Sequence, residues 1–248
     1  MKTRRFFAHS RCRQGDTIIL SRQQCHHLKD VLRLGIGDTV RCFSETGLES
    51  EARIASFADS GACLTVIEDY SPSDTRLCPL ILAQSLVKAS KMDFIIQKAV
   101  ELGCTEIIPF FSDHSIIQLD ERRQESKQKR WYAIAVEAAK QCGRADLPVI
   151  HDCVPFARLV DMLKAYDITL FADPAGTTSD IRPLLKSGCT TAVAIGPEGG
   201  FSPAEKEAAR QIPNCHTWTF NRNTARAETA AVAALSIIAY EYELISQC

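Results

Sequence analysis

The chain of 248 residues is 46% hydrophobic and 24% charged, and its formal net charge at pH 7 is −1. This composition is typical of a folded globular protein and excludes a disordered or fibrous chain. No apolar run reaches the roughly 18 residues that a membrane-spanning helix needs, and no apolar stretch follows the basic N-terminus as in a secretion signal. We therefore expect a cytoplasmic protein without a membrane segment.

The 11 cysteines are spread through the chain, and no Cys-x-x-Cys pair occurs. This spacing excludes the paired motifs of a zinc knuckle or a thioredoxin-like redox site. Cytoplasmic cysteines of this kind are typical of buried free thiols. We expect core packing for Cys12, Cys42 and Cys63, and no bound metal.

The first part of the chain is basic although the whole is nearly neutral. Residues 1–41 contain nine Lys or Arg and three Asp. Neutralisation of phosphates by such side chains supplies most of the sequence-independent affinity of proteins for nucleic acid, so this segment suits a polyanion. On charge alone, an ordinary solvated surface explains it too.

Short alternating segments up to residue 70 predict strands at residues 5–9, 17–20, 39–43, 52–57 and 63–68. A helix is predicted at residues 26–34, and turn residues separate the later strands. These elements predict a small β-barrel domain over residues 1–71. Residues 72–79 contain two prolines and little periodicity, so we expect a linker there.

From residue 80 the pattern alternates between strands and helices, which predicts a parallel sheet covered by helices on both faces. Strands are expected at residues 80–87, 106–111, 168–171, 191–195 and 215–220, and helices at 92–102, 120–142, 156–165, 181–185 and 227–244. Gly103 and Gly143 stand where helices should end. The last helix is nearly apolar, so we expect burial over most of its circumference, against the domain or a second subunit.

A glycine-rich turn at residues 196–200 joins a buried strand to a further helix. Ser202 is the predicted N-cap of that helix, with Pro203 at its first position and Glu205 completing a capping box. Adjacent glycines let the backbone approach a ligand, and open α/β sheets bind ligands at the carboxyl ends of parallel strands. A glycine pair before a helix is also common as a plain structural joint, so this motif alone does not establish a site.

The ligand expected at this turn has no phosphate groups. The sequence contains neither Gly-Lys-Ser nor Gly-Lys-Thr, which excludes a P-loop. The run Gly-Pro-Glu-Gly-Gly also lacks the GxGxxG spacing that seats a pyrophosphate on a helix end.

Five separated blocks resemble one known family. They are residues 4–7 (RRFF), 88–103 (KASKMDFIIQKAVELG), 137–144 (EAAKQCGR), 195–205 (IGPEGGFSPAE) and 226–235 (RAETAAVAAL). In order and spacing, over nearly the whole chain, they are similar to the bacterial 16S rRNA uridine-N3 methyltransferases of the SPOUT superfamily. Five matching blocks are far more specific than any one of them.

The resemblance implies an α/β fold of the SPOUT type over residues 80–248, preceded by a small PUA-like β-barrel that binds RNA. In this fold the parallel sheet has helices on both faces, and the last helix is threaded through an earlier loop to form a deep trefoil knot, an exception to ordinary chain topology. The resemblance also implies a homodimer with active sites near the subunit interface. The implied substrate is 16S rRNA or the small ribosomal subunit.

The resemblance further implies that three knot loops bind S-adenosylmethionine in a bent form. These loops comprise residues 171–174, 196–200 and 220–225. The implied cofactor-binding residues are Phe171, Ala172, Asp173, Ile195, Gly196, Pro197, Glu198, Gly199, Gly200, Phe220, Asn221, Arg222, Thr224, Ala225 and Thr229.

The last loop departs from the family's pattern. The family usually has Leu-Gly-x-Arg-Ile-Leu before Arg-Ala-Glu-Thr, whereas residues 220–225 read Phe-Asn-Arg-Asn-Thr-Ala. Asn221 in place of glycine is tolerable because Asn adopts positive φ more easily than most residues. Thr224 and Ala225 in place of Ile-Leu remove apolar surface that would cover the adenine, at roughly 0.8 kcal/mol per buried methylene. We therefore expect weaker cofactor binding than in relatives that keep Ile-Leu.

Arg226 and Glu198 are the candidate catalytic residues. Transfer of an activated methyl to uracil N3 needs alignment, which alone supplies about 7 to 11 kcal/mol, and removal of the N3 proton. We expect Arg226, where the last loop meets the last helix, to stabilise charge developing on the uracil; a salt bridge is the alternative. Glu198 would accept a proton or hold a ligand amine or hydroxyl, the alternative being a helix-capping acid. Glu228 is interpreted as a first-turn helix acid.

RNA contacts are expected from eight polar side chains. Their contacts with phosphates would position the RNA on the protein without reading its base sequence. They are Arg4, Arg5, His26, Arg33, Lys88, Lys91, Gln141 and Arg144. A uridine in structured RNA would have to be exposed first, as flipped bases are. His114, His151 and His216 lack the partner spacing of a metal site or a triad, and we interpret them as structural.

Two alternatives stay open. The same fold transfers methyl groups to other acceptors, such as a ribose 2′-hydroxyl or another base atom, because a fold does not determine a function. The second alternative is a non-catalytic rRNA-binding protein whose cofactor loop has degraded, which the unusual residues 220–225 suggest.

Overall fold

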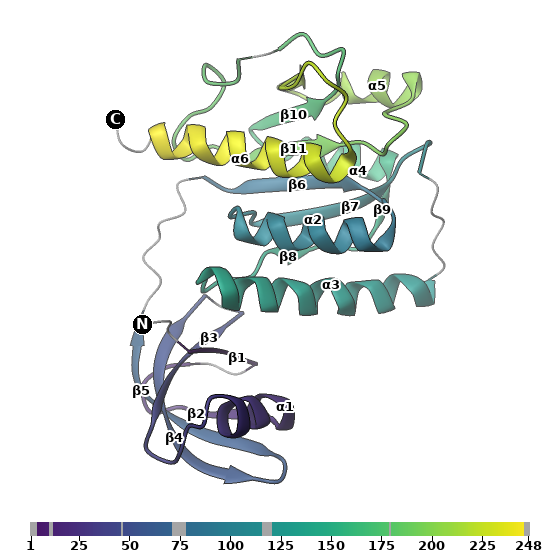
Figure 1. Cartoon of the computed structure of the whole chain (residues 1–248). Coiled ribbons are helices and arrows are strands. Elements are labelled where there is room, and N and C mark those ends of the chain that lie inside the picture. The colour runs from purple at the N-terminus through teal and green to yellow at the C-terminus, as the bar shows by residue number, and fades with distance from the viewer. Residues whose placement is uncertain are drawn as a thin grey trace. The chain divides into compact units, whose positions relative to one another are not determined.

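The structure is a computed structural model of the chain (Figure 1). It describes residues 4–9, 12–45, 47–70, 78–115, 121–178 and 180–245, with the backbone alone for 121–123. Two compact units are described separately: an N-terminal unit of Met1–Thr75 with Ala139–Leu147, and a C-terminal unit of Arg76–Ala138 with Pro148–Cys248. Most of the expected linker, residues 72–77, lies outside the described residues. Within the described ranges, no helix is long and apolar enough to cross a membrane.

The strands expected in the N-terminal unit are all present. They are β1 (Arg5–Ala8), β2 (Thr17–Ser21), β3 (Thr39–Ser44), β4 (Glu49–Ala58) and β5 (Gly61–Tyr70). They form one sheet in the order β1-β3-β4-β5-β2, in which β1 and β3 run parallel and the other neighbours antiparallel. Cys12 and Cys42 are buried in its core, as expected. Cys63 is only half-buried, because strand alternation turns it away from the core that Leu64 enters.

The helix of the N-terminal unit begins earlier than expected. The prediction was residues 26–34, whereas α1 spans Arg22–His26 and continues as a π-helical turn, η1, over His27–Val31. A capping box sets this start, because the Ser21 hydroxyl accepts from Gln24 N and Gln24 Oε1 accepts from Ser21 N. The Ser-x-x-Gln signal was in the sequence and was overlooked.

The C-terminal unit contains a parallel sheet of seven strands. They are β6 (Leu80–Ser85), β7 (Glu106–Phe111), β8 (Val149–Ile150), β9 (Val154–Pro155), β10 (Ile168–Ala172), β11 (Thr191–Ile195) and β12 (Cys215–Trp218). The order is β12-β10-β11-β6-β7-β8, with β9 beside β7. The strands β8 and β9 were not predicted, because two residues are too few to show a period.

Helices cover both faces of this sheet, as predicted. On one face α6 (Ala227–Ile245) packs beside α2 (Ala89–Glu101) and over β6 and β11. On the other face α4 (Phe156–Leu163) and α5 (Pro203–Ala209) share a core with the alternate side chains of the strands, such as Ala192 and Ala194 of β11. The long helix α3 (Glu121–Cys142) lies between β7 and β8 in the chain. Together they give the expected α/β architecture.

Two predicted elements differ from the structure. Residues 181–185 were expected to form a helix but form a hydrogen-bonded turn, in which Leu184 N donates to Ile181 O. Leu185 N also donates to Ile181 O, but a segment of five residues gains too few hydrogen bonds to offset the cost of nucleating a helix. The strand expected at residues 215–220 ends at Trp218, where the chain turns into the last loop.

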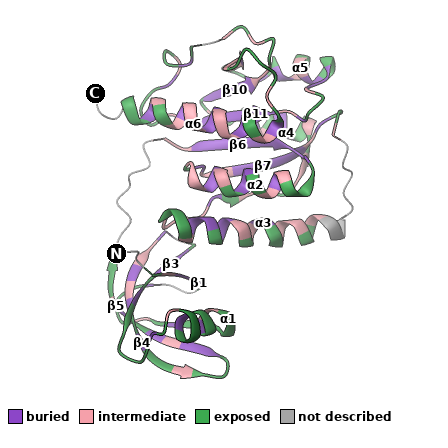
Figure 2. Ribbon diagram, in the orientation of Figure 1, coloured by how far each residue is buried: buried purple, intermediate pink, exposed green. Residues whose placement is uncertain are grey.

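Within one chain, α6 is buried along one stripe and not over most of its circumference, so the expected burial against a second subunit stays a prediction (Figure 2). The buried residues Ala227, Ala231, Ala234, Leu235, Ile238 and Tyr242 recur at helical spacing. On other sides of the helix, Tyr240 is 62% exposed and Leu244 41%. Within one chain, the sheet and α2 therefore cover only part of this apolar helix.

Candidate functional site

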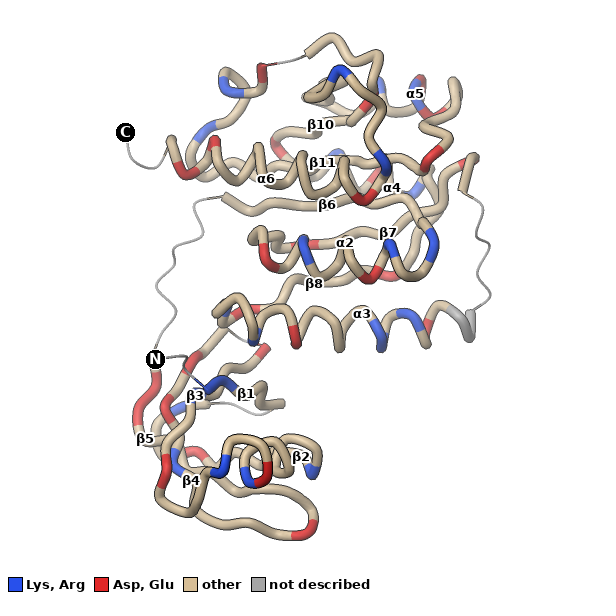
Figure 3. The backbone as a smooth tube through the Cα atoms, viewed as in Figure 1, with Lys and Arg blue, Asp and Glu red and all other residues tan. Residues whose placement is uncertain are grey.

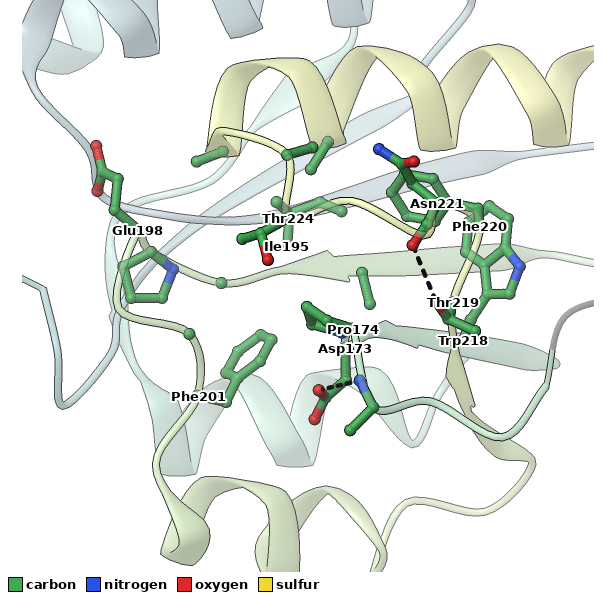
Figure 4. A pocket seen from close by; sticks show the side chains of 18 of the residues that line it. Asp173, Pro174, Ile195, Glu198, Phe201, Trp218, Thr219, Phe220, Asn221 and Thr224 are labelled. Atoms are coloured by element: carbon green, nitrogen blue, oxygen red, sulfur yellow. Dashed lines mark hydrogen bonds between the residues drawn. The ribbon is translucent and has the colours of Figure 1, made fainter.

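A pocket of about 320 Å³ lies at the carboxyl ends of three neighbouring strands, β12, β10 and β11 (Figure 4). The loops that follow these strands and the first turn of α6 line it. Small-molecule sites in proteins typically enclose about 300 to 1,000 Å³, so the pocket has the size of a ligand site. It lies where parallel α/β sheets bind ligands.

The glycine-rich loop after β11 is held by local contacts. A Cβ on Gly196 would lie 3.0 Å from the Phe201 ring, and Gly200 adopts a positive φ of 70°. The helix α5 then begins as expected, because the Ser202 hydroxyl accepts from Glu205 N while the Glu205 carboxylate accepts from Ser202 N. The loop therefore presents its backbone to the pocket while its outer side is packed.

The loops after β10 and β12 are hydrogen-bonded to each other. Asp173 N donates to Trp218 O at 3.0 Å, and Thr219 N donates to Thr178 O at 3.0 Å. Gly176 stands where these segments meet, and a Cβ there would lie 2.7 Å from the Trp218 carbonyl carbon. The two loops therefore form one continuous wall of the pocket.

The charged side chains in the pocket lining are Asp173, Glu198 and Lys206. Lys206 Nζ lies 2.6 Å from Asp173 Oδ2. Burial opposes ionisation of Asp173, but hydrogen bonds from Lys206 and from Ala175 N outweigh it and hold the pKa of this carboxyl below its ordinary value. Because the lysine is already paired, the lining favours a ligand without phosphate groups.

Glu198 lies at the pocket rim, and its carboxylate turns away from the centre of the pocket (Figure 4). Its Oε1 accepts a hydrogen bond from Lys91 Nζ of α2 at 2.7 Å, and Lys91 also lies 3.3 Å from Glu228 Oε2 of α6. The hydrogen bond from Lys91 lowers the pKa of Glu198 and raises that of Lys91. A carboxyl group whose pKa is lowered is a weaker base, so this geometry favours a structural role for Glu198 over proton acceptance.

Most residues expected to bind a cofactor line the pocket. They are Ala172, Asp173, Ile195, Gly196, Pro197, Glu198, Gly199, Gly200, Phe220, Asn221, Thr224 and Ala225. Three do not. Phe171 is fully buried under the pocket, with its ring centroid 3.9 Å from that of Phe201 in the core below the sheet. Arg222 is exposed, and Thr229 is turned outwards because Ala227 and Ala230 occupy the pocket side of α6.

Pro174 and Asn223 also line the pocket and belong to two of the loops expected to bind the cofactor. The lining residues outside the expected set are Ala175, Phe201, Lys206, Trp218, Thr219, Ala227 and Ala230. Phe201 and Trp218 carried a usable signal, because each is an aromatic residue directly beside a loop expected to bind the ligand. Lys206 carried none, since only the folded chain brings α5 beside Asp173.

Arg226 lies at the start of α6, where its carbonyl oxygen accepts a hydrogen bond from Ala230 N. It is exposed and does not line the pocket, although Ala225 before it and Ala227 after it do. Within the described part of the chain, no hydrogen bond or ion pair involves its guanidinium. The alternative of a salt bridge is therefore not realised there, and the side chain faces solvent beside the pocket.

The residues expected to contact RNA differ in how far they are engaged in the fold. Arg4, Arg33 and Gln141 of the N-terminal unit and Lys88 of the C-terminal unit are exposed. His26 is exposed as well and pairs with Asp30 at 2.5 Å. These side chains are open to a ligand.

Arg5 and Arg144 are engaged in structural contacts of the N-terminal unit. The Arg5 side chain is 7% exposed and donates to Glu49 Oε1, Ala139 O and Arg144 O, each at 3.1 Å. Arg144 forms a two-point pair with Asp146, at 3.1 and 2.8 Å. Both guanidinium groups therefore stabilise the unit itself.

The histidines occupy structural positions. His114 Nδ1 lies 3.0 Å from Gly200 O, His151 Nε2 lies 2.8 Å from Glu106 Oε2, and His216 is half-buried on β12. Among the described residues, no group of His, Cys, Asp or Glu is arranged to hold a metal ion.

The chain matches the family of RNA methyltransferase domains over residues 74–239. It is 30% identical over 239 residues to the ribosomal RNA small subunit methyltransferase E of Bacillus subtilis (strain 168), covering 94% of this chain and 93% of the relative. It is 27% identical over 241 residues to the protein of the same name from Rickettsia conorii, covering 95% of each chain.

Solved structures of the same kind have the same fold. The putative methyltransferase from Legionella pneumophila, in complex with S-adenosylmethionine, superposes with a TM-score of 0.87 at 25% identity over 96% of this chain and 97% of its own. The ribosomal RNA small subunit methyltransferase E from Neisseria gonorrhoeae, also bound to S-adenosylmethionine, gives a TM-score of 0.83 at 26% identity, covering 95% of this chain and 96% of that one.

Proposed function

The chain belongs to the family of RNA methyltransferase domains, and from that premise we propose that it transfers a methyl group from S-adenosylmethionine to N3 of a uridine in 16S rRNA. The observation that carries the proposal is the three-loop pocket at the carboxyl ends of β10, β11 and β12. It lies in a chain that is similar over nearly its whole length to small-subunit rRNA methyltransferases. Bacterial rRNA lies in the cytoplasm, and we place the activity there.

The pocket's chemistry fits S-adenosylmethionine. The backbone of residues 196–200 faces it, and Ile195, Phe220 and Ala225 offer apolar surface for an adenine. Asp173 and Asn221 provide acceptors for hydroxyl or amine groups. The paired state of Lys206 disfavours a phosphate-containing cofactor instead. When bound, S-adenosylmethionine supplies an activated methyl group on a positively charged sulfur.

Arg226 is the residue we propose to act on the uracil. It stands beside the pocket mouth with its charge unpaired by any described side chain. A positive group held near the base stabilises the negative charge that develops as N3 loses its proton. Glu198, held ionised by Lys91, serves as a support for the glycine-rich loop in this proposal and not as the proton acceptor.

We assign RNA docking to residues 1–71 and catalysis to residues 80–248. Figure 3 shows Arg on β3 and α1 of the N-terminal unit, and Asp and Glu along β4 and β5. The exposed Arg4 and Arg33 suit phosphate contacts, and Lys88 of the C-terminal unit lies at the N-cap of α2. Arg5 and Arg144 are left out, because their guanidinium groups are bound within the unit.

We also propose the trefoil knot, the PUA-like character of the N-terminal unit and the homodimer. The homodimer is supported by α2 and α6, neighbouring helices on which Phe94 (43%), Tyr240 (62%) and Leu244 (41%) expose large apolar side chains. Large exposed apolar side chains on two neighbouring helices suit an interface with a second chain. Sedimentation of the purified protein tests the dimer directly.

The experiment that tests the function combines cofactor titration with mapping of the methylated nucleoside. The purified protein is titrated calorimetrically with S-adenosylmethionine and incubated with 16S rRNA and small subunits that lack the modification. We expect binding at one site per chain and 3-methyluridine in the digested RNA. A ribose-methylated or differently methylated nucleoside would establish another acceptor. No cofactor binding and no transfer would leave an RNA-binding protein with a degraded loop.

A further inference from the structure

Three charged side chains from three distant segments meet beside the pocket. Lys91 comes from the first turn of α2, Glu198 from the glycine-rich loop and Glu228 from the first turn of α6. Lys91 Nζ lies 2.7 Å from Glu198 Oε1 and 3.3 Å from Glu228 Oε2. We call these three residues the Lys91 cluster.

The Lys91 cluster differs from an ordinary surface ion pair. Exposed pairs within one helix contribute little, because water screens them and the side chains lose freedom on pairing. Here the lysine side chain is 25% exposed and the two carboxylates 40% and 19%, and the partners are 107 or more positions apart in the chain. The cluster therefore adds a charged link between the glycine-rich loop and the helices α2 and α6, which also pack against each other.

Two of the three pocket walls end at this cluster. Glu198 is the central residue of the glycine-rich loop, whose backbone lines the pocket. Glu228 lies in the first turn of α6, three residues after the last loop ends at Ala225, and Ala225 and Ala227 line the pocket. Glu198 also points out of the pocket, so Lys91 holds the loop from behind without occupying the ligand's space (Figure 4).

We propose that Lys91 is a positioning residue that fixes the glycine-rich loop against the start of α6, and so sets both the width of the cofactor pocket and the place of Arg226. Arg226 lies two residues before Glu228, so a shift of the first turn of α6 moves it too. The inference rests on the proposed function for the identity of the cofactor. It also replaces phosphate binding, the role first expected of Lys91, because its ammonium group already faces two carboxylates.

Removal of Lys91 takes away the cation that lies within 3.3 Å of both carboxylates, and leaves Lys88 as a weaker counter-charge near Glu198. Like charges at this range repel, so the loop and the helix start should separate, and the pocket should lose the arrangement that fits its ligand. Since Lys91 touches neither RNA nor cofactor in this proposal, the effect should appear in cofactor affinity and not in the electrostatic part of RNA binding.

The test is calorimetric titration of S-adenosylmethionine into Lys91→Met, Lys91→Arg and Lys98→Met. Lys98 is a matched control, because it lies on the same helix, is 30% exposed and pairs with Glu101 at 2.7 Å, away from the pocket. We expect the affinity of Lys91→Met to fall about tenfold or more, as for loss of a linked charge pair, with Lys91→Arg within about threefold of the unmodified chain. Lys98→Met should bind as the unmodified chain does.

If Lys91→Met does not fold, Glu198→Gln and Glu228→Gln still test the proposal. Each of them keeps the side-chain shape and removes one charge of the cluster. In a double-mutant cycle with Lys91→Met, the losses in affinity should be clearly less than additive, because each change breaks the same link. Additive losses would overturn the proposal even if each single variant binds weakly.

RNA binding separates positioning from phosphate contact. Lys91→Met should keep the salt dependence of 16S rRNA binding, whereas a phosphate contact would lower the slope by about one unit. An unchanged cofactor affinity with a flatter salt slope would overturn the inference and leave the proposed function standing. If the unmodified chain itself binds no S-adenosylmethionine, the proposed function fails, and the inference fails with it.

Discussion

Glu205 of α5 accepts a hydrogen bond at 3.1 Å from the hydroxyl of Ser112, a residue 93 positions earlier in the chain, in the loop after β7. The same carboxylate accepts from Asp113 N at 3.0 Å and from Ser202 N at 2.8 Å, and Glu205 is only 3% exposed. One buried side chain therefore completes the capping box and joins two loops at the carboxyl edge of the sheet.

Replacement of Glu205 by Ala should destabilise the protein by about 3 kcal/mol, because it removes a cap and leaves the buried Ser202 N and the part-buried Asp113 N without their acceptor. Urea unfolding of the variant measures the change. Glu207→Ala is the control, since Glu207 lies on the same helix but is 63% exposed and pairs with the nearby Arg210. Equal losses in the two variants would contradict the linking role of Glu205.

Restoring apolar residues in the last loop should strengthen cofactor binding. Thr224 and Ala225 line the pocket, so Thr224→Ile with Ala225→Leu adds apolar surface against the ligand. We expect a gain of about 1 to 2 kcal/mol, or roughly tenfold in the dissociation constant of S-adenosylmethionine. Calorimetric titration checks it. Weaker binding by the double variant would mean that the present loop already closes on the cofactor in another way.

Arg226→Ala should separate binding from catalysis. The side chain lies outside the pocket lining, so cofactor affinity should stay within about twofold, while the rate of methyl transfer falls about 100- to 1,000-fold, as for loss of one charge-stabilising group. Transfer of labelled methyl under single-turnover conditions measures the rate. Arg210→Ala is the control for loss of a surface arginine, because Arg210 is the C-cap residue of α5 and its side chain is 71% exposed. A transfer rate close to that of the unmodified chain would remove Arg226 from the mechanism.

Substitution of Arg5 should lower stability, whereas substitution of the neighbouring Arg4 should weaken RNA binding. Arg5→Met should lower the free energy of unfolding by about 2 to 4 kcal/mol, because the Arg5 guanidinium makes three hydrogen bonds and is nearly buried. Arg4→Met should leave stability unchanged and lower the salt slope of rRNA binding by about one unit. Urea unfolding and filter binding at several salt concentrations separate the two. The reverse pattern would show that the exposed and buried arginines have been assigned the wrong roles.

Cys215 should be unreactive near neutral pH. Burial raises the pKa of its thiol to about 11. A raised pKa keeps the thiol protonated, so at pH 8 roughly 0.1% is thiolate, against roughly a quarter for a thiol of ordinary pKa. Iodoacetamide labelling followed by peptide mass spectrometry should show Cys142, which is exposed, reacting far faster, and the rate at Cys215 should rise about tenfold per pH unit from 8 to 10. Equal labelling rates for Cys142 and Cys215 at pH 8 would show that β12 often detaches from the sheet and exposes Cys215.

The sequence predicted helices and strands correctly where the contacts that form them lie within a few residues of each other. The strand β7 was predicted with its observed ends, and the cap of α5 was predicted down to the pairing of Ser202 with Glu205. The start of α1 had such a signal in Ser21 and Gln24, and the error there was one of interpretation. In contrast, β8 and β9 form only because β7 offers an edge, so no local pattern marks them.

The candidate site divides in the same way. The glycine-rich loop and its ligand class followed from residue types at short spacing, and the resemblance named the other two loops and the cofactor. The directions of side chains did not follow: Phe171 faces the core, and Glu198 faces Lys91 instead of the pocket. Both depend on which face of a strand or loop meets a distant neighbour.

Periodicity, capping and glycine placement act over a few residues, so the sequence was enough to predict the order of the elements, the α/β class of the C-terminal unit and the position of the glycine-rich loop. The folded chain was needed to show that Arg5 is bound within the fold, that Arg226 has no partner among the described residues, and that Lys91 joins Glu198 to Glu228. The two groups of features differ in the sequence distance over which their contacts act. Charges and hydrogen bonds at 3 Å depend on how segments more than a hundred residues apart pack together, and no local pattern encodes that distance.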